Sequence, residues 1–97
     1  MKVVIAFEYD ADIIEMPDTP VDSLKKYKKG FDKWIQDRRI KHGYWERDGK
    51  RILGVNYRAD AFVEWLNTYV FTEERERAKV LETVVIEYEK TWPHLFL

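Results

Sequence analysis

The stretch TVVIEYE, residues 83–89, decides the fold, because it fits two different periodicities. Val84, Ile86 and Tyr88 stand at every second position, which is the spacing of one face of a β-strand. Apolar residues also keep a helical spacing that starts upstream, at Ala78, Leu81, Val84, Val85 and Tyr88. We favour a helix that ends at Lys90, because no turn residue interrupts this longer pattern.

The remaining elements can be placed from their local patterns. The apolar and aromatic run at 2–9 predicts a strand, and the proline-containing stretch at 10–19 predicts a loop. Thr19 has the position of a helix N-cap, so an amphipathic helix is expected over 20–39. A second apolar stripe predicts a helix over 60–71.

A β-hairpin is the clearest local signal in the chain. The pair Asp48-Gly49 suits the two central positions of a type I′ turn and would join strands at 43–47 and 50–57. Gly54 lies within the second strand and indicates a twist or bulge there.

These elements predict one α+β domain over residues 1–97. With a helix at its end the order is β-α-β-β-α-α, a three-stranded, antiparallel-containing sheet with helices packed on it. With a strand over 83–89 the order becomes β-α-β-β-α-β, the ferredoxin-like arrangement.

The composition is that of a soluble globular protein. The 97 residues are 45% hydrophobic and 36% charged, and they include no cysteine, which excludes disulfides and cysteine nucleophiles. No apolar run approaches the length of a membrane span and no signal peptide is recognisable. We therefore expect a cytoplasmic protein that does not contact a membrane.

Charge is distributed unevenly along the chain. Residues 1–20 carry one base and five acids, residues 21–58 twelve bases and five acids, and residues 59–97 four bases and eight acids. A basic middle between two acidic ends indicates either an electrostatic binding surface or internal charge complementarity.

The basic segment has the features of a nucleic-acid-binding surface. Lysines occupy the polar face of the predicted first helix, arginines continue into the hairpin, and two aromatic residues are placed to stack on unpaired bases. The candidate residues are Lys25, Lys26, Lys28, Lys29, Lys33, Arg38, Arg39, Tyr44, Trp45, Arg47, Lys50 and Arg51. The alternative is an ordinary solvated helix face beside aromatic core residues.

An acidic stretch, FEYDADIIEMPD at residues 7–18, is the candidate metal site. Glu8, Asp10 and Asp12 would share one face of a strand and offer the oxygen ligands that Mg²⁺ prefers. Along a strand, however, successive ligands would be about 7 Å apart, and no glycine-rich phosphate loop accompanies them. A polar strand end followed by a turn is the simpler interpretation.

The carboxyl-terminal segment TWPHLFL, residues 91–97, is rich in large apolar side chains. It either folds back over the core or presents an anchor to a partner or to a second copy. The anchor residues would be Trp92, Leu95, Phe96 and Leu97.

No residue spacing predicts a catalytic site or a bound cofactor, so we expect neither. The sequence favours a small non-catalytic binding or regulatory protein that acts through protein–protein interaction or self-association. Nucleic-acid binding through the basic helix and hairpin is the second hypothesis. A divalent-metal-dependent phosphoryl-transfer or nuclease-type enzyme using Asp10 and Asp12 is the third.

Overall fold

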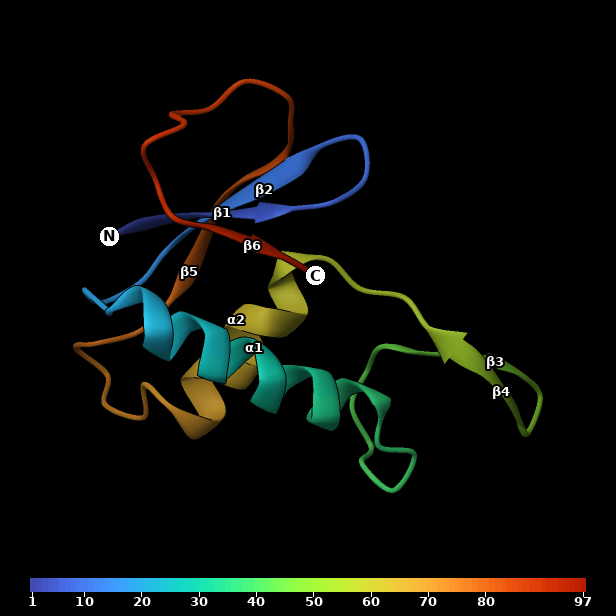
Figure 1. Ribbon diagram of the computed structural model, residues 1–97. Coiled ribbons are helices and arrows are strands. Elements are labelled where there is room, and N and C mark those ends of the chain that lie inside the picture. Colours follow the sequence, from blue (N-terminus) through green and yellow to red (C-terminus); the bar gives the residue numbers. More distant parts are fainter.

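The computed structural model describes all residues, 1–97, as two helices and six strands in two sheets (Figure 1). In chain order the elements are β1 (Lys2–Ala6), β2 (Ala11–Glu15), α1 (Val21–Gln36), β3 (Trp45–Asp48), β4 (Arg51–Val55), α2 (Ala59–Tyr69), β5 (Lys79–Val85) and β6 (His94–Phe96). The main sheet has the order β5-β2-β1-β6, in which only β1 and β6 run parallel, and β3 pairs with β4 alone. Neither helix is long and apolar enough to cross a membrane.

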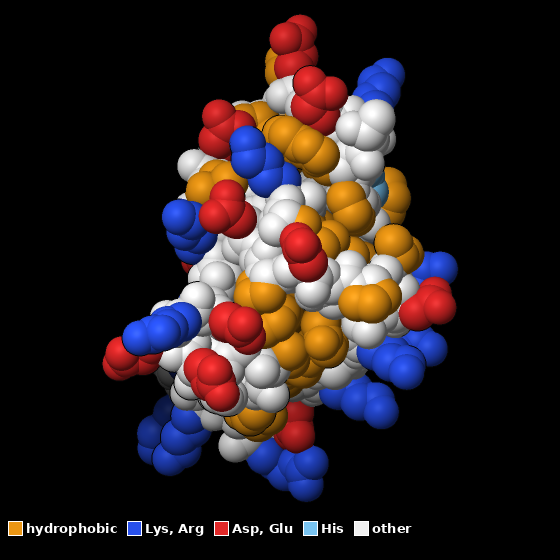
Figure 2. All heavy atoms as spheres, turned by 90° about the vertical axis from the view of Figure 1, so that its left-hand side faces the viewer, with side chains coloured by type: hydrophobic (Ala, Val, Ile, Leu, Met, Phe, Trp, Pro, Cys, Tyr) orange, Lys and Arg blue, Asp and Glu red, His pale blue; other side chains and the backbone are white.

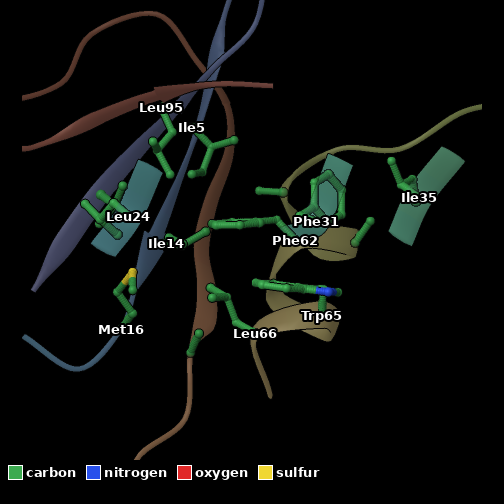
Figure 3. Packing of buried hydrophobic residues seen from close by; sticks show 14 residues of the cluster. Ile5, Ile14, Met16, Leu24, Phe31, Ile35, Phe62, Trp65, Leu66 and Leu95 are labelled. Atoms are coloured by element: carbon green, nitrogen blue, oxygen red, sulfur yellow. The ribbon is translucent and has the colours of Figure 1, made fainter. Parts of the chain in front are cut away.

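Both helices pack on one face of the main sheet and form the principal core. Figure 3 shows Phe31 of α1 and Phe62 of α2 meeting at its centre, with their ring centroids 5.4 Å apart. Ile5 and Leu95 close this core from the sheet side. The α+β class predicted from the sequence is therefore confirmed.

The opposite face of the sheet is covered by the chain that follows β5. Val4 and Ile13 point away from the helices and are fully buried. Tyr88 and Trp92 pack against them from the segment between β5 and β6, which arches over the sheet in Figure 1. Both faces of the two central strands, β1 and β2, are thus buried from solvent.

The strand predicted over 2–9 forms but is shorter, and the prediction of a loop over 10–19 is wrong. The first strand ends at Ala6, and a tight turn closed by the Phe7 N–H donating to the Asp10 carbonyl (2.8 Å) leads into β2. Two isoleucines in the predicted loop, Ile13 and Ile14, are core residues of β2. The acidic residues Asp12 and Glu15 interrupt the apolar pattern of β2, so the sequence did not predict this strand.

The helix predicted to end at Lys90 is also wrong. Residues 79–85 form β5, which pairs antiparallel with β2. The β-branched run at 83–86 has a high strand propensity, and the free edge of β2 supplies a hydrogen-bonding partner. The strand alternative was correct for 83–85, but neither predicted order holds, because β2 and β6 add a strand near each end.

The predicted helices and hairpin form with shifted ends. The first helix runs Val21–Gln36 rather than 20–39, and the Thr19 hydroxyl donates to the Pro17 carbonyl instead of capping the helix. The second helix is Ala59–Tyr69.

The hairpin turn lies one residue later than predicted. Asp48 and Arg51 pair directly, so Gly49 and Lys50 occupy the turn. Only Gly49 has a positive φ, 60°, which is the pattern of a type II′ turn and not of type I′. The predicted irregularity at Gly54 is confirmed by a register shift beside it.

Gly30 allows the two helices to approach closely. A Cβ atom at this position would lie 2.6 Å from Cζ2 of Trp65. We expect Gly30→Ala to lower the free energy of unfolding by about 1–3 kcal/mol through overpacking, although alanine is the better helix former by about 1 kcal/mol. Urea denaturation followed by tryptophan fluorescence measures this change, and a more stable variant would contradict the packing described here.

Candidate functional site

The exposed face of α1 carries a row of lysines. Three residues of this helix are buried in the core, and four exposed lysines lie elsewhere on its surface: Lys25, Lys26, Lys29 and Lys33. In Figure 2 a row of Lys and Arg side chains lines the lower right margin, on the side of α1, whereas most of the charged side chains in the middle of the view are acidic. The predicted lysine face is therefore accessible to solvent.

The hairpin projects from the rest of the molecule. We name residues 45–55, which comprise β3, β4 and their turn, the β3–β4 arm. It forms its own two-stranded sheet and extends beyond the end of α1 (Figure 1), which contributes to a longest dimension of 43 Å. Arg47, Lys50 and Arg51 are exposed around its tip.

Most cations in this part of the chain have no anionic partner. Of the twelve in residues 21–58, only Lys28, Arg39 and Arg58 form ion pairs. The nine that remain are all exposed, and we name them the basic surface: Lys25, Lys26, Lys29, Lys33, Arg38, Lys41, Arg47, Lys50 and Arg51. Two of the five acids in the same residues are paired, so nine free cations face three free carboxylates.

The aromatic residues predicted to stack on bases belong instead to a cluster at the root of the arm. The Trp45 indole N–H donates to the Ile40 carbonyl (2.8 Å), and its ring stacks on His42 with centroids 4.6 Å apart. Tyr44 contacts Trp34 and His42. Burial, with the nearby charges of Glu64 and Asp60, raises the pKa of Tyr44 to about 12. Both Tyr44 and Trp45 therefore hold the arm to the domain.

The acidic stretch contains the only buried charged residue, Asp12. Its carboxylate accepts hydrogen bonds from the Arg58 guanidinium (2.7 Å to Nη2) and from the backbone N–H groups of Ala59 (3.1 Å) and Val84 (3.0 Å). Burial acts to raise the pKa of Asp12, but the hydrogen bonds from Arg58, Val84 and Ala59 outweigh it and lower the pKa below its ordinary value of 3.8. The residue is thus held as a carboxylate.

Asp12 joins three elements of the fold. Ala59 opens α2, so the carboxylate lies at the positive end of that helix, where a negative charge is stabilised. Val84 belongs to β5 and has a φ of 54°, which is rare for a β-branched residue, and its N–H is fixed by Asp12. Arg58 also binds Asp10 (2.8 Å) and lies over the Phe7 ring.

The predicted metal ligands do not converge. Asp10 and Asp12 both face Arg58, whereas Glu8 is exposed on the β1–β2 turn. No group of three potential ligands lies close enough to hold an ion. The guanidinium occupies the position where a cation would sit, and the sequence offered no sign of this because Arg58 is 46 residues from Asp12.

An open cleft of about 460 Å³ borders the Asp12–Arg58 pair. The rest of its lining consists of Asn56, Tyr57, Asp60, Val80, Thr83 and Val84. Burial raises the pKa of the Tyr57 hydroxyl above its ordinary value of 10.0. The cleft holds hydrogen-bonding groups. The Asp12 carboxylate in its lining, however, is fully engaged by Arg58 and backbone N–H groups, so it is not free to act as a general base.

Most of the carboxyl-terminal segment is built into the fold. Leu95 is 6% exposed in the principal core and Trp92 covers Val4. Leu97 is half-buried, and its N–H donates to the Ala6 carbonyl. Only Phe96, at 69% exposed, is free among the four predicted anchor residues.

Two further exposed apolar residues lie at the end of the sheet that carries Phe96. The last complete row across the sheet joins Val85, Ala11, Ala6 and Phe96. Tyr9 (85% exposed) and Ile86 (79% exposed) lie just beyond this row. We name Tyr9, Ile86 and Phe96 the apolar end; sequence reasoning missed its first two members because it depends on strand register.

Comparison of this chain with protein-family models, curated proteins and solved structures finds no match.

Proposed function

We propose that this domain binds nucleic acid through its basic surface. The observation that carries the proposal is the arrangement of nine exposed, unpaired cations along one helix, the loop that follows it and a projecting arm. Phosphate backbones attract such a surface. Lysine and arginine side chains neutralise the phosphates and so release the counterions bound to them. The chemistry required is positional and electrostatic, and needs no catalytic group.

The small net charge of −1 does not oppose this proposal. Charges more than a Debye length apart, about 8 Å at physiological salt, are largely screened from each other. A phosphate beside α1 therefore responds to the nearby lysines rather than to the total charge. Three acids of residues 21–58 have no partner. Asp22 lies in the first turn of α1, and Glu46 and Asp48 lie on the arm.

Protein–protein interaction, the first hypothesis from sequence, rested on the carboxyl-terminal segment and on the lack of a residue spacing that predicts catalysis. Because Leu95 is a core residue and β6 is part of the main sheet, that segment is not a free anchor. The support for nucleic acid, by contrast, increases once the cations are seen to be exposed and unpaired. For the metal-dependent enzyme, Arg58 already occupies the space between the two aspartates.

Charge reversal tests the proposal with a matched control. Lys25→Glu/Lys29→Glu should weaken binding to a labelled oligonucleotide about tenfold or more at low salt, because two phosphate contacts are lost. Arg75→Glu/Arg77→Glu changes the net charge equally at two exposed residues outside the basic surface and should have little effect. Fluorescence anisotropy gives both dissociation constants. Equal losses for the two variants would show that only net charge matters and would overturn the proposed site.

The apolar end supports a second candidate function, binding of another protein. Glu8 and Glu87 are exposed and flank Tyr9 and Ile86 in the chain, so the surface suits a partner segment that combines apolar and basic side chains. A displayed peptide library selected on this protein should converge on such sequences. The same selection on the Tyr9→Ser/Ile86→Ser variant should not enrich such sequences. A selection on the wild-type protein that does not converge would contradict this candidate.

A further inference from the structure

We infer that the nucleic acid is a B-form DNA duplex and that the β3–β4 arm enters its major groove. This inference rests on the proposed function and specifies its ligand. Three features of the basic surface bear on it: the state of its aromatic residues, the shape of the arm, and the placement of α1 beside the arm.

The aromatic residues argue against a single strand. Proteins that bind single strands without a duplex stack successive bases on exposed aromatic side chains. Every aromatic residue between 21 and 58 is buried or half-buried, and Trp45, the one nearest the arm's tip, uses its indole N–H and its ring face within the protein. The basic surface therefore offers cations without stacking platforms, which suits a ligand whose bases are already paired.

The shape of the arm suits the major groove. A two-stranded ribbon has strands about 4.8 Å apart, and the major groove of B-DNA, about 12 Å wide, admits such a ribbon. The arm places Arg47 and Arg51 on adjacent strands near its tip, with Lys50 in the turn between them. Arg47 pairs with Ile52 and Arg51 with Asp48, so the two arginines lie on opposite faces of the ribbon and reach toward the two walls of the groove. Arginine is the side chain that most often contacts guanine in this groove.

The position of α1 supplies the contacts to phosphate. Lys25 and Lys33 are eight residues apart on the helix, a separation of about 12 Å. They lie on the element that leads into the arm, so a duplex that receives the arm can run beside them (Figure 1). The longest dimension of 43 Å corresponds to about 13 base pairs at 3.4 Å each.

A-form RNA should be a poor ligand. Its major groove is deep and narrow and does not admit protein elements, whereas its shallow minor groove is read through 2′-hydroxyl groups. The arm would be left outside an RNA duplex, and only the lysines of α1 would contact it. The inference therefore separates DNA duplexes from both RNA duplexes and single strands.

The test compares three labelled ligands of about 16 nucleotides or base pairs: a DNA duplex, one of its single strands, and an RNA duplex of the same sequence. Anisotropy titrations at one salt concentration should show the DNA duplex bound about tenfold more tightly than the others. Arg47→Ser/Arg51→Ser should remove most of this preference, whereas Arg75→Ser/Arg77→Ser, which deletes the same charge, should preserve it. Circular dichroism checks that both variants are folded.

The outcomes separate the two levels of the proposal. Equal or tighter binding to the single strand or to RNA, or an arm variant that behaves like its control, would overturn the duplex inference while leaving nucleic-acid binding in place. Absence of binding to all three ligands at low salt would overturn the proposed function itself.

Discussion

Replacing Asp12 by asparagine is expected to lower the free energy of unfolding by about 2–4 kcal/mol. This is less than the cost of breaking a fully buried ion pair, because the Arg58 side chain is 37% exposed and keeps its contact with Asp10. The variant leaves the Arg58 guanidinium without its main counter-ion. Asparagine keeps one acceptor oxygen, but its NH2 group takes the place of the other, so either the Ala59 N–H or the Val84 N–H loses its acceptor. Since domains of this size are stable by about 5–15 kcal/mol, much of the total would be lost.

Asp10→Asn provides the matched control. Asp10 makes a single hydrogen bond to Arg58, and its side chain is 22% exposed, so solvent can replace that contact. We expect a loss of about 1 kcal/mol or less for this variant. Urea denaturation of both variants gives the comparison, and similar losses would show that Asp12 does not have the linking role described here.

The same pair predicts how stability changes with pH. Because the folded-state pKa of Asp12 lies below its ordinary value of 3.8, the residue stabilises the fold above about pH 4, and this contribution is lost as pH falls through the folded-state pKa. The difference in stability between wild type and Asp12→Asn should therefore be full at neutral pH and shrink in acid. A difference that stays constant down to about pH 2 would contradict a lowered pKa.

Deleting residues 92–97 is expected to unfold the domain. The deletion removes β6 and the backbone hydrogen bond from the Val4 N–H to the Pro93 carbonyl (2.8 Å). It also exposes the core around Leu95 and uncovers Val4 on the opposite face. Loss of a buried leucine side chain alone costs about 2–5 kcal/mol, and this deletion adds an edge strand to that loss.

The truncated chain should give the circular dichroism spectrum of an unfolded protein. Its amide proton NMR signals should show the narrow dispersion of an unfolded chain. Phe96→Ser, which changes an exposed residue of the same strand, should remain folded. A truncated chain with native dispersion would show that β6 is dispensable, and the segment would again be available as an anchor for a partner.

Local signals predicted the elements whose stability is local. The hairpin follows from its turn residues and the second helix from its apolar stripe, and both form within two or three residues of the predicted ends in most cases. By contrast, β2 contains Asp12, whose charge is compensated by a residue far along the chain. β5 and β6 form by pairing with the two edges of the β1–β2 hairpin. A short window of sequence carries no information about these long-range partners.

The candidate site was predictable to a similar extent. The charge counts located the basic segment, and its lysines other than Lys28 are exposed as expected. Which cations are free depends on side-chain pairing, such as Lys28 with Asp32. The roles of Tyr44 and Trp45 depend on the packing of the loop between α1 and β3, so sequence placed them in a ligand site and the structure places them at the root of the arm.

The most direct test of nucleic-acid binding is the salt dependence of wild-type affinity for a DNA duplex. If about five of the nine free cations contact phosphates, the logarithm of the association constant should fall with the logarithm of salt concentration with a slope of about −4.5. Such a slope, with tight binding at low salt, is the predicted result. Binding that is absent at low salt, or that does not change with salt, would contradict the assignment of the basic surface.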